Sequence, residues 1–183
     1  MGNVPRPLLI PHPTKDTLML DTTALRAAYR ALLDAAATVA DAPHRLTPPA
    51  GEWNADQILA HVSLLTATTI ATASAVAAGR HTSYDNRLSL DTWTIANVIA
   101  LTGDNTALRE RVRQQGEALC ALGGAGLTDR ELDTLVPTRL LSAHTLLLDQ
   151  PLALRDLFGG LTDSELPGHT DQLLALLPAP VAA

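Results

Sequence analysis

Hydrophobic positions along this 183-residue chain recur mainly at helical spacing. In the first clear case, from Leu25 to Val39, apolar side chains fall every three or four residues, which is the period of one face of a helix. Several later segments show the same spacing of apolar residues, and proline or glycine clusters separate these segments. We therefore expect helices over residues 21–40, 54–78, 90–101, 105–122 and 162–177, with a short one over 150–158.

Two short leucine-rich runs differ from the rest of the chain. Residues 136–143 and 145–149 lack a helical period, so we predict two strands that turn near Ala143-His144. Pro137 and Pro151 are expected to bracket the strands, because proline lacks an N–H for the ladder. A small β-hairpin is therefore predicted before the last helices.

Glycine pairs indicate where two helices should stop. Gly123-Gly124 should end the helix that begins near residue 105, and Gly159-Gly160 should close a short helix with Pro151 in its first turn. Residues 82–86 are polar and are expected to form a loop.

The length suits one domain. We expect an extended, proline-rich lead-in over residues 1–16, a single mainly helical domain over 17–177, and a loose tail over 178–183.

Composition and charge narrow the function classes. Aromatic residues make up 3% of a chain that is 46% hydrophobic, so the core must be mostly aliphatic. The net charge is −6 and there is no basic cluster, which argues against nucleic-acid binding. Cys120 is the single cysteine, which excludes an intramolecular disulfide and a cysteine-cluster metal site. No uninterrupted apolar run reaches roughly 18 residues, so we expect a cytoplasmic protein without a membrane partner.

The most informative segment is the helix start near residue 54. Asn54 is a good N-cap, and Gln57 three residues later completes a capping box. Trp53 and Ile58 fit a hydrophobic staple across the cap. The helix then carries His61 about two turns from its start.

His61 shares one helix face with aliphatic residues. Ile58, His61, Val62 and Leu65 stand at positions i, i+3, i+4 and i+7 of the helix, which lie on one face. His61 should therefore point to the interior. The ordinary interpretation is a core histidine with a local hydrogen-bond partner. The alternative is a ligand or an acid/base group in an internal pocket.

These parts, in this order, resemble the DinB/YfiT-like superfamily. The resemblance rests on Trp53 and His61 at the helix start, the two-strand excursion, and the sequence Leu-Pro-Gly-His-Thr-Asp-Gln-Leu over residues 166–173. The superfamily includes the mycothiol-dependent maleylpyruvate isomerases and related thiol transferases. The resemblance implies a four-helix bundle with a cavity at one end. In metal-binding members, one histidine comes from the second helix and two come from the last helix as His-x-x-x-His.

Carried over to this chain, the metal triad is incomplete. His61 matches the first ligand and His169 the first histidine of the last-helix pair, but Leu173 stands at the second position of that pair. Glu165, four residues before His169, is a substitute, although the Pro-Gly pair between them argues against a regular helical turn. Catalytic zinc normally has three protein ligands. We therefore expect no required metal, and at most a weakly bound zinc or nickel ion at His61, His169 and Glu165.

A ligand pocket is expected near the two histidines. The polar residues after position 83 are either a solvated loop or a lid whose side chains contact a ligand. The residues expected to bind substrate are Trp53, Leu65, Tyr84, Asp85, Arg87, Trp93 and Leu173.

The sequence leaves three functions open. The first is a small-molecule enzyme in which His61 and His169 catalyse a metal-independent isomerisation, cyclisation or hydrolysis by acid/base chemistry. The second, implied by the resemblance, is a transferase or isomerase that depends on a divalent metal and mycothiol. The third is a non-catalytic ligand-binding protein. A small molecule is the expected partner in each, and a homodimer stays open.

Overall fold

The structure is a computed structural model that describes residues 20–43, 47–142 and 145–178. The expected extended lead-in over residues 1–16, the turn at Ala143-His144 and the tail beyond Pro178 lie outside the described residues.

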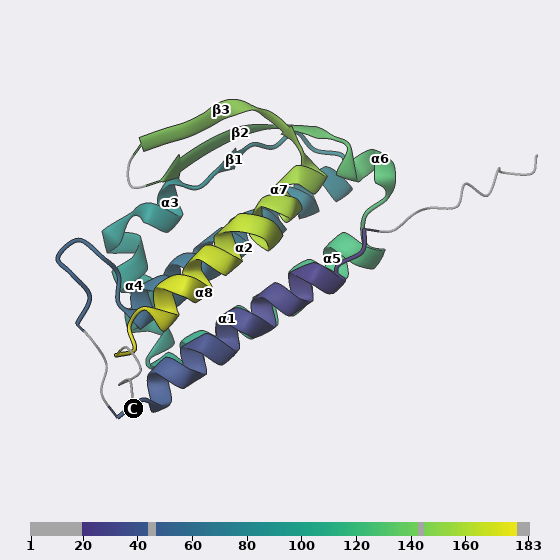
Figure 1. Cartoon of the computed structure of the whole chain (residues 1–183). Helices are drawn as coiled ribbons and strands as arrows, with labels where there is room; N and C mark the ends of the chain where they lie inside the picture. Colours follow the sequence, from purple (N-terminus) through teal and green to yellow (C-terminus); the bar gives the residue numbers. More distant parts are fainter. Residues whose placement is uncertain (1–19, 44–46, 143–144, 179–183) are drawn as a thin grey trace, which may run out of the picture.

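The chain is mainly helical with a small sheet, as the hydrophobic pattern predicts (Figure 1). Long helices pack against one another: α2 lies against α5, and α1 lies against both α5 and α8. The sheet lies on the side of α2 that faces away from α1 (Figure 1). The helices are α1 (Thr23–Asp41), α2 (Ala55–Ala77), α3 (Arg87–Leu90), α4 (Thr92–Thr102), α5 (Asn105–Ala125), α6 (Asp129–Leu132), α7 (Leu154–Gly160), the π-helical turn η1 (Leu161–Glu165) and α8 (Leu166–Leu174).

The core is aliphatic, as the scarcity of aromatic residues requires. Leu32 from α1, Ile58 and Leu59 from α2, Leu108 from α5 and Leu173 from α8 are each at most 1% exposed. These side chains meet in one continuous cluster, which joins the four helices.

By length and composition alone, α2 is long and apolar enough to cross a membrane, although polar residues interrupt its apolar run. About two thirds of its most apolar window, 67%, is buried against the rest of the protein. Its hydrophobicity is therefore that of a central core helix.

The hairpin is present, but it is longer than expected. β2 (Leu135–Ser142) pairs antiparallel with β3 (Thr145–Ala153), and Pro137 and Pro151 lie opposite each other inside the strands rather than bracketing them. Two prolines can face each other because a non-hydrogen-bonded pair needs no N–H from either residue.

A third strand replaces part of the expected loop. β1 (Tyr84–Asp85) pairs parallel with β2 through Thr138 and Arg139. A two-residue strand carries no alternating pattern that sequence reading can detect. The expectation of a loop over residues 82–86 is therefore wrong at these two positions.

The predicted stop at Gly123-Gly124 is wrong, and at Gly160 the α-helical pattern ends as predicted but the chain continues as a π turn. α5 continues through Gly123 and Gly124 to Ala125. A Cβ on Gly123 would stand 2.6 Å from the ring of Phe158, so this glycine allows close packing rather than ending the helix. Gly160 leads without a break into η1 and then α8. The preceding short helix begins at Leu154 instead of residue 150, because Pro151 belongs to β3.

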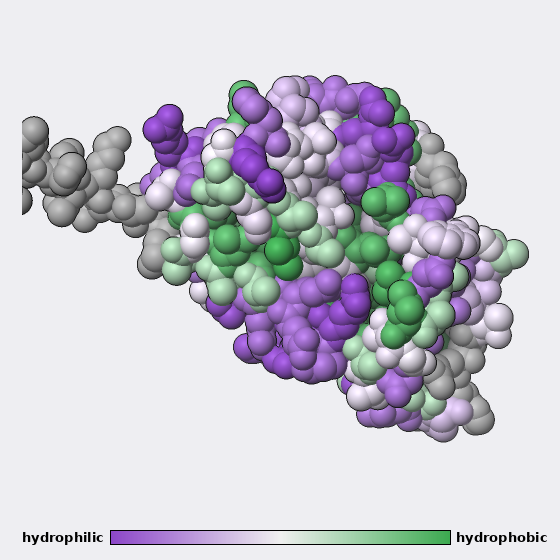
Figure 2. All heavy atoms as spheres, turned by 180° about the vertical axis from the view of Figure 1, so that it is seen from behind, coloured by the Kyte–Doolittle hydropathy of each residue, from purple (hydrophilic) through white to green (hydrophobic). Residues whose placement is uncertain are grey.

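Several large hydrophobic side chains stay on the surface. Leu101 and Trp93 of α4 are 86% and 74% exposed, and Leu147 of β3 is 66% exposed. Figure 2 shows hydrophobic side chains gathered in parts of one face, next to strongly hydrophilic areas. Apolar surface of this kind is typical of contact regions, so a homodimer stays a prediction.

Candidate functional site

The N-terminal cap of α2 sets the position of His61. The Asn54 side chain accepts a hydrogen bond from the backbone N–H of Gln57 (3.0 Å), and the Gln57 side chain accepts one from the backbone N–H of Asn54 (2.9 Å). This reciprocal capping box fixes the first turn. The apolar face that starts with Ile58 then packs into the core and carries His61 inward, where it is 3% exposed.

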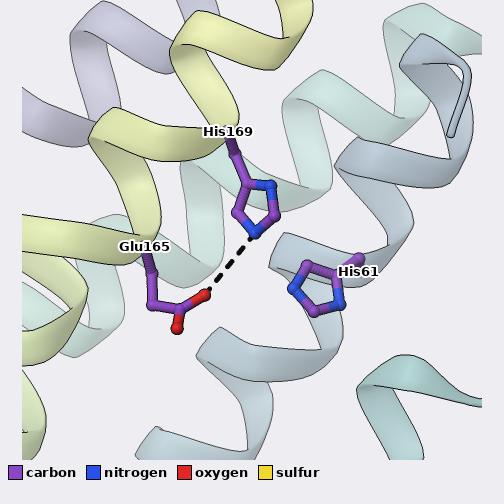
Figure 3. Close-up of side chains that lie close together, drawn as sticks. All are labelled: His61, Glu165 and His169. Atoms are coloured by element: carbon purple, nitrogen blue, oxygen red, sulfur yellow. Dashed lines mark ion pairs between the residues drawn. The ribbon is translucent and has the colours of Figure 1, made fainter. Parts of the chain in front are cut away.

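His61 and His169 lie side by side although 108 positions separate them in the sequence (Figure 3). Their ring centroids are 4.7 Å apart in an edge-to-face arrangement, and His169 on α8 is 9% exposed. The expectation that the two histidines share a site in space is confirmed. Trp53 packs on both, with its ring 4.6 Å from that of His61 and 6.3 Å from that of His169.

Each histidine has one ring nitrogen that contacts an oxygen atom. Nδ1 of His61 lies 2.7 Å from the carbonyl oxygen of Ser89, and Nδ1 of His169 lies 2.8 Å from Oε1 of Gln172. A backbone carbonyl only accepts, so Nδ1 of His61 must donate. The Gln172 amide has both a donor and an acceptor group, so its contact does not fix the tautomer of His169. Nε2 of the neutral His61 ring is then an unprotonated acceptor, which is the tautomer that metal-binding histidines adopt.

Glu165 brings a carboxylate to the same point. Its Oε2 lies 3.5 Å from Nε2 of His169, one helical turn away (Figure 3). The atoms of His61, Glu165 and His169 that can coordinate a metal lie within 4.8 Å of one another. The three ligand atoms therefore come from α2 and from the junction of η1 and α8.

The expected break between Glu165 and His169 does not occur. The backbone N–H of Leu166 donates to Leu161, five residues earlier, and α8 then continues regularly through Pro167 and Gly168. Pro167 stands in the first turn of α8, where a missing N–H costs little. The wider π turn before it shifts the hydrogen-bond register by one residue. Glu165 and His169 consequently face the same side.

The electrostatics keep the imidazole of His61 neutral and the carboxyl of Glu165 ionised. Burial, reinforced by the neighbouring His169, lowers the pKa of His61 to about 4. The hydrogen bond with His169 lowers the pKa of Glu165 below its usual value, against the opposing effect of burial. Neutral imidazole and carboxylate are the forms that coordinate a metal.

These three residues fit a divalent metal of the zinc type. Nitrogen and oxygen donors from two histidines and one glutamate form a known catalytic zinc set, which leaves one position open. Bonds of about 2.0–2.1 Å in a tetrahedron separate the ligand atoms by about 3.3–3.4 Å. The 3.5 Å between Glu165 and His169 already meets this spacing, and all three ligand atoms lie within 4.8 Å of one another.

A hollow of about 580 Å³ lies beside α3, the helix whose residue Ser89 is hydrogen-bonded to His61. Arg87 forms an ion pair with Asp85 (2.6 Å) at its edge. Both belong to the residues expected to bind substrate. The lining residues are Asp85, Arg87, Leu88, Leu90, Asp91 and Leu141.

The other residues expected to bind substrate have different places. Tyr84 is 5% exposed in β1, and Leu65 and Leu173 are core side chains at 3% and 0%. Trp93 stands on the outer surface of α4, away from the histidines' buried cluster. Leu173 therefore fills the core on the turn after His169, while the carboxylate that accompanies His169 comes from the turn before it.

Sequence reading missed the partners that orient the two rings. Gln172 stands three residues after His169, a spacing that places two side chains on one helix face, so its role was detectable. Ser89 contributes a backbone carbonyl from 28 positions away, for which no residue type is a signal.

Comparisons of the chain with protein-family models, with curated proteins and with solved structures found no match.

Proposed function

We propose that this protein is a DinB-like, metal-dependent enzyme in which His61, Glu165 and His169 hold a divalent ion, zinc being the best fit. In this proposal α1, α2, α5 and α8 form the four-helix bundle of that superfamily. The reaction is a transfer or isomerisation that uses a low-molecular-weight thiol such as mycothiol, in the cytoplasm. The superfamily and the thiol come from the sequence resemblance, and the metal centre comes from the geometry.

One observation carries the metal proposal: atoms of His61, Glu165 and His169 that can bind a metal lie within 4.8 Å of one another, and both imidazoles are buried. With Nδ1 of His61 donating to the Ser89 carbonyl, Nε2 of His61 is a buried acceptor next to the His169 ring and the carboxylate of Glu165. Buried acceptors without a donor are unfavourable. A cation between them removes that cost.

The expectation of weak metal binding depended on there being two ligands. Glu165 supplies a third, so we propose a tighter site than the sequence predicted. A bound zinc ion would supply Lewis acidity, which polarises a carbonyl group or lowers the pKa of a thiol. The Ser89 carbonyl holds His61 in the ligating tautomer, and Trp53 covers both rings on one side.

Substrate is proposed to enter from the hollow beside α3. Leu88, Leu90 and Leu141 make much of its wall apolar, and Arg87 stands at its edge. Ligand sites typically combine an apolar wall with a few polar groups. This arrangement suits a small, largely apolar molecule. The acidic chain favours neither nucleic acid nor another polyanion as a partner.

The metal-independent alternative also has a specific observation in its favour. The 3.5 Å contact between His169 Nε2 and Glu165 Oε2 is that of a carboxylate–imidazolium pair when His169 is protonated. Such a pair can deliver and recover a proton in acid/base catalysis. In this second candidate function the same two side chains act without an ion.

A measurement of zinc binding distinguishes the metal-dependent enzyme from the metal-independent one. We expect the purified, untagged protein to bind one zinc ion with a dissociation constant on the order of a micromolar or tighter at pH 7, because the imidazole of His61 is neutral and the carboxyl of Glu165 is ionised there. Glu165→Gln and His61→Ala should each weaken binding at least about 10-fold by calorimetric titration, since each removes a ligand from a three-ligand site.

Asp163→Asn is the matched control for Glu165→Gln. Asp163 is an exposed carboxylate in the same π turn and is outside the cluster, so its replacement should leave the zinc affinity unchanged. Equal zinc affinity in wild type and Glu165→Gln would remove the metal centre. A thiol-dependent activity that survives complete chelation would then support the acid/base candidate.

A further inference from the structure

The short helix α3 is tied to His61 by its backbone. Ser89 is 1% exposed, and its carbonyl oxygen accepts the hydrogen bond from Nδ1 of His61 at 2.7 Å. This carbonyl therefore decides which ring nitrogen carries the proton. The position of the Ser89 carbonyl depends on the contacts that hold α3 in place.

Asn86, the residue before α3, fastens it to the sheet. The Asn86 side chain donates from Nδ2 to the carbonyl oxygen of Leu141 (2.8 Å) and accepts at Oδ1 from the N–H of Leu141 (2.9 Å). One amide thus pairs with both polar groups of one residue of β2. Asn86 is 4% exposed, so these bonds form without competition from solvent.

The main chain of Asn86 continues the connection to Ser89. Its carbonyl oxygen accepts from the backbone N–H of Ser89 (3.0 Å) and from the Ser89 hydroxyl (2.7 Å). An unbroken series of hydrogen bonds therefore runs from Leu141 of β2, through Asn86 and Ser89, to the ring of His61.

We infer that Asn86 is a positioning residue of the candidate centre: by anchoring α3 to β2, it places the Ser89 carbonyl so that His61 is held as the Nδ1–H tautomer with Nε2 free. The functional meaning of this inference rests on the proposed metal centre. The tautomer of His61 itself does not, because it is a property of the protein without metal.

Asparagine is the residue type that this anchor requires. Its amide offers one donor and one acceptor side by side, matching the carbonyl and N–H of Leu141. Aspartate keeps the acceptor but replaces the donor by an oxygen, which repels the Leu141 carbonyl. With α3 released, the Nδ1 acceptor is no longer fixed, and the tautomer with a proton on Nε2 becomes populated. That proton occupies the lone pair that a metal needs.

The test is nitrogen NMR of the histidine side chains in the full-length, metal-free protein. The wild type should show His61 as the Nδ1–H tautomer. Asn86→Asp should show a mixture in which the Nε2–H form is clearly present, with a zinc affinity about 10–100-fold lower, as expected when the partner of a metal-ligating histidine is lost.

Thr138→Val is the matched control. Thr138 is 2% exposed on the same strand, and its replacement by valine removes one buried hydrogen bond, to Val136, which lies outside the series that runs to His61. It should lower stability but keep the wild-type His61 tautomer. If Asn86→Asp fails to fold, Ser89→Ala serves instead, because it removes only the hydroxyl bond to Asn86 and should shift the tautomer to a smaller degree.

The outcomes are distinct for the two proposals. A folded Asn86→Asp variant, or a folded Ser89→Ala variant used in its place, whose His61 stays wholly Nδ1–H overturns the positioning role. A tautomer change in a protein whose wild type binds no zinc keeps the positioning role and removes the metal centre. Zinc binding through His61 with an unaltered tautomer in the variant removes the positioning role alone.

Discussion

Gly116, in the middle of α5, is a residue whose missing side chain decides the contact between two helices. A Cβ placed there would stand 2.9 Å from ring atoms of Tyr29 on α1. The Tyr29 ring cannot withdraw easily, because it is 4% exposed and its hydroxyl is hydrogen-bonded to Thr66 of α2 at 2.7 Å. Tyr29 therefore links three helices through a space that only glycine leaves open.

We expect Gly116→Ala to lower the free energy of unfolding by about 1–3 kcal/mol, the usual cost of overpacking a core. The better helix propensity of alanine, about 1 kcal/mol, works in the opposite direction and is outweighed. Urea unfolding measures the difference. Gly159→Ala in α7 is the control, because no heavy atom lies within 4 Å of its Cβ and only the propensity gain remains. A Gly116→Ala protein as stable as the control would contradict the packing argument.

The candidate site shows which residue-scale features a sequence contains. The inward direction of His61 follows from its spacing relative to Ile58 and Val62, and the structure confirms it. The sequence indicates Glu165 as a substitute ligand but not its favourable position, since the wider turn that accommodates Pro167 has no sequence signal. The Ser89 carbonyl is backbone, so no residue identity predicts it.

At the scale of elements, the cap of α2 connects local sequence to the site. The capping box at Asn54 and Gln57 fixes the first turn, and two turns later the same helix presents His61. A second capping box, at Thr128 and Glu131, starts the short helix α6 away from the histidines. The two boxes share their chemistry, but only the first begins a helix that carries a residue of the candidate site.

We expect Asn54→Ala to cost about 1 kcal/mol of stability, because the first turn of α2 loses a side-chain acceptor. Thr128→Ala should cost a similar amount. Hydrogen exchange distinguishes them: the amides of the first turns of α2 should lose protection in Asn54→Ala and keep it in Thr128→Ala. Unchanged protection and unchanged stability in Asn54→Ala would show that packing alone holds this helix start.

Element boundaries are predictable where the signal is local and poorly predictable where tertiary contacts decide. Asn54, Gly79 and Gly103 mark real helix limits, and Gly79 and Gly103 have positive φ angles of 66° and 103°. Gly123 is also a glycine, but it lies within the last turn of α5, where it packs against the ring of Phe158. A sequence pattern does not distinguish a glycine needed for its φ angle from one needed for its size.

At the scale of the whole molecule, the two tyrosines of the chain share one property. Tyr29 and Tyr84 are both almost completely buried, and burial is the main cause that raises the pKa of each. The pKa of Tyr84 rises to about 12, partly offset by its hydrogen bond with Thr69. Burial also raises the pKa of the Cys120 thiol. The folded protein therefore resists releasing these protons at alkaline pH.

The consequence is a cooperative alkaline unfolding. A tyrosine in the unfolded chain ionises near pH 10, so the stability that the neutral folded form provides is complete below that pH. It is lost as the pH rises from about 10 towards the folded pKa, by up to about 1.4 kcal/mol per pH unit for each tyrosine. Tyrosinate absorbance should therefore stay low until the helical circular dichroism disappears, and the two signals should then change together.

Strong denaturant provides the control, because both tyrosines should titrate near pH 10 in it. Tyr84→Phe should make the loss of stability with pH less steep, since one of the two coupled ionisations is gone. Gradual tyrosinate formation centred near pH 10 with native circular dichroism would mean that both hydroxyls are open to solvent, against the burial on which this prediction rests.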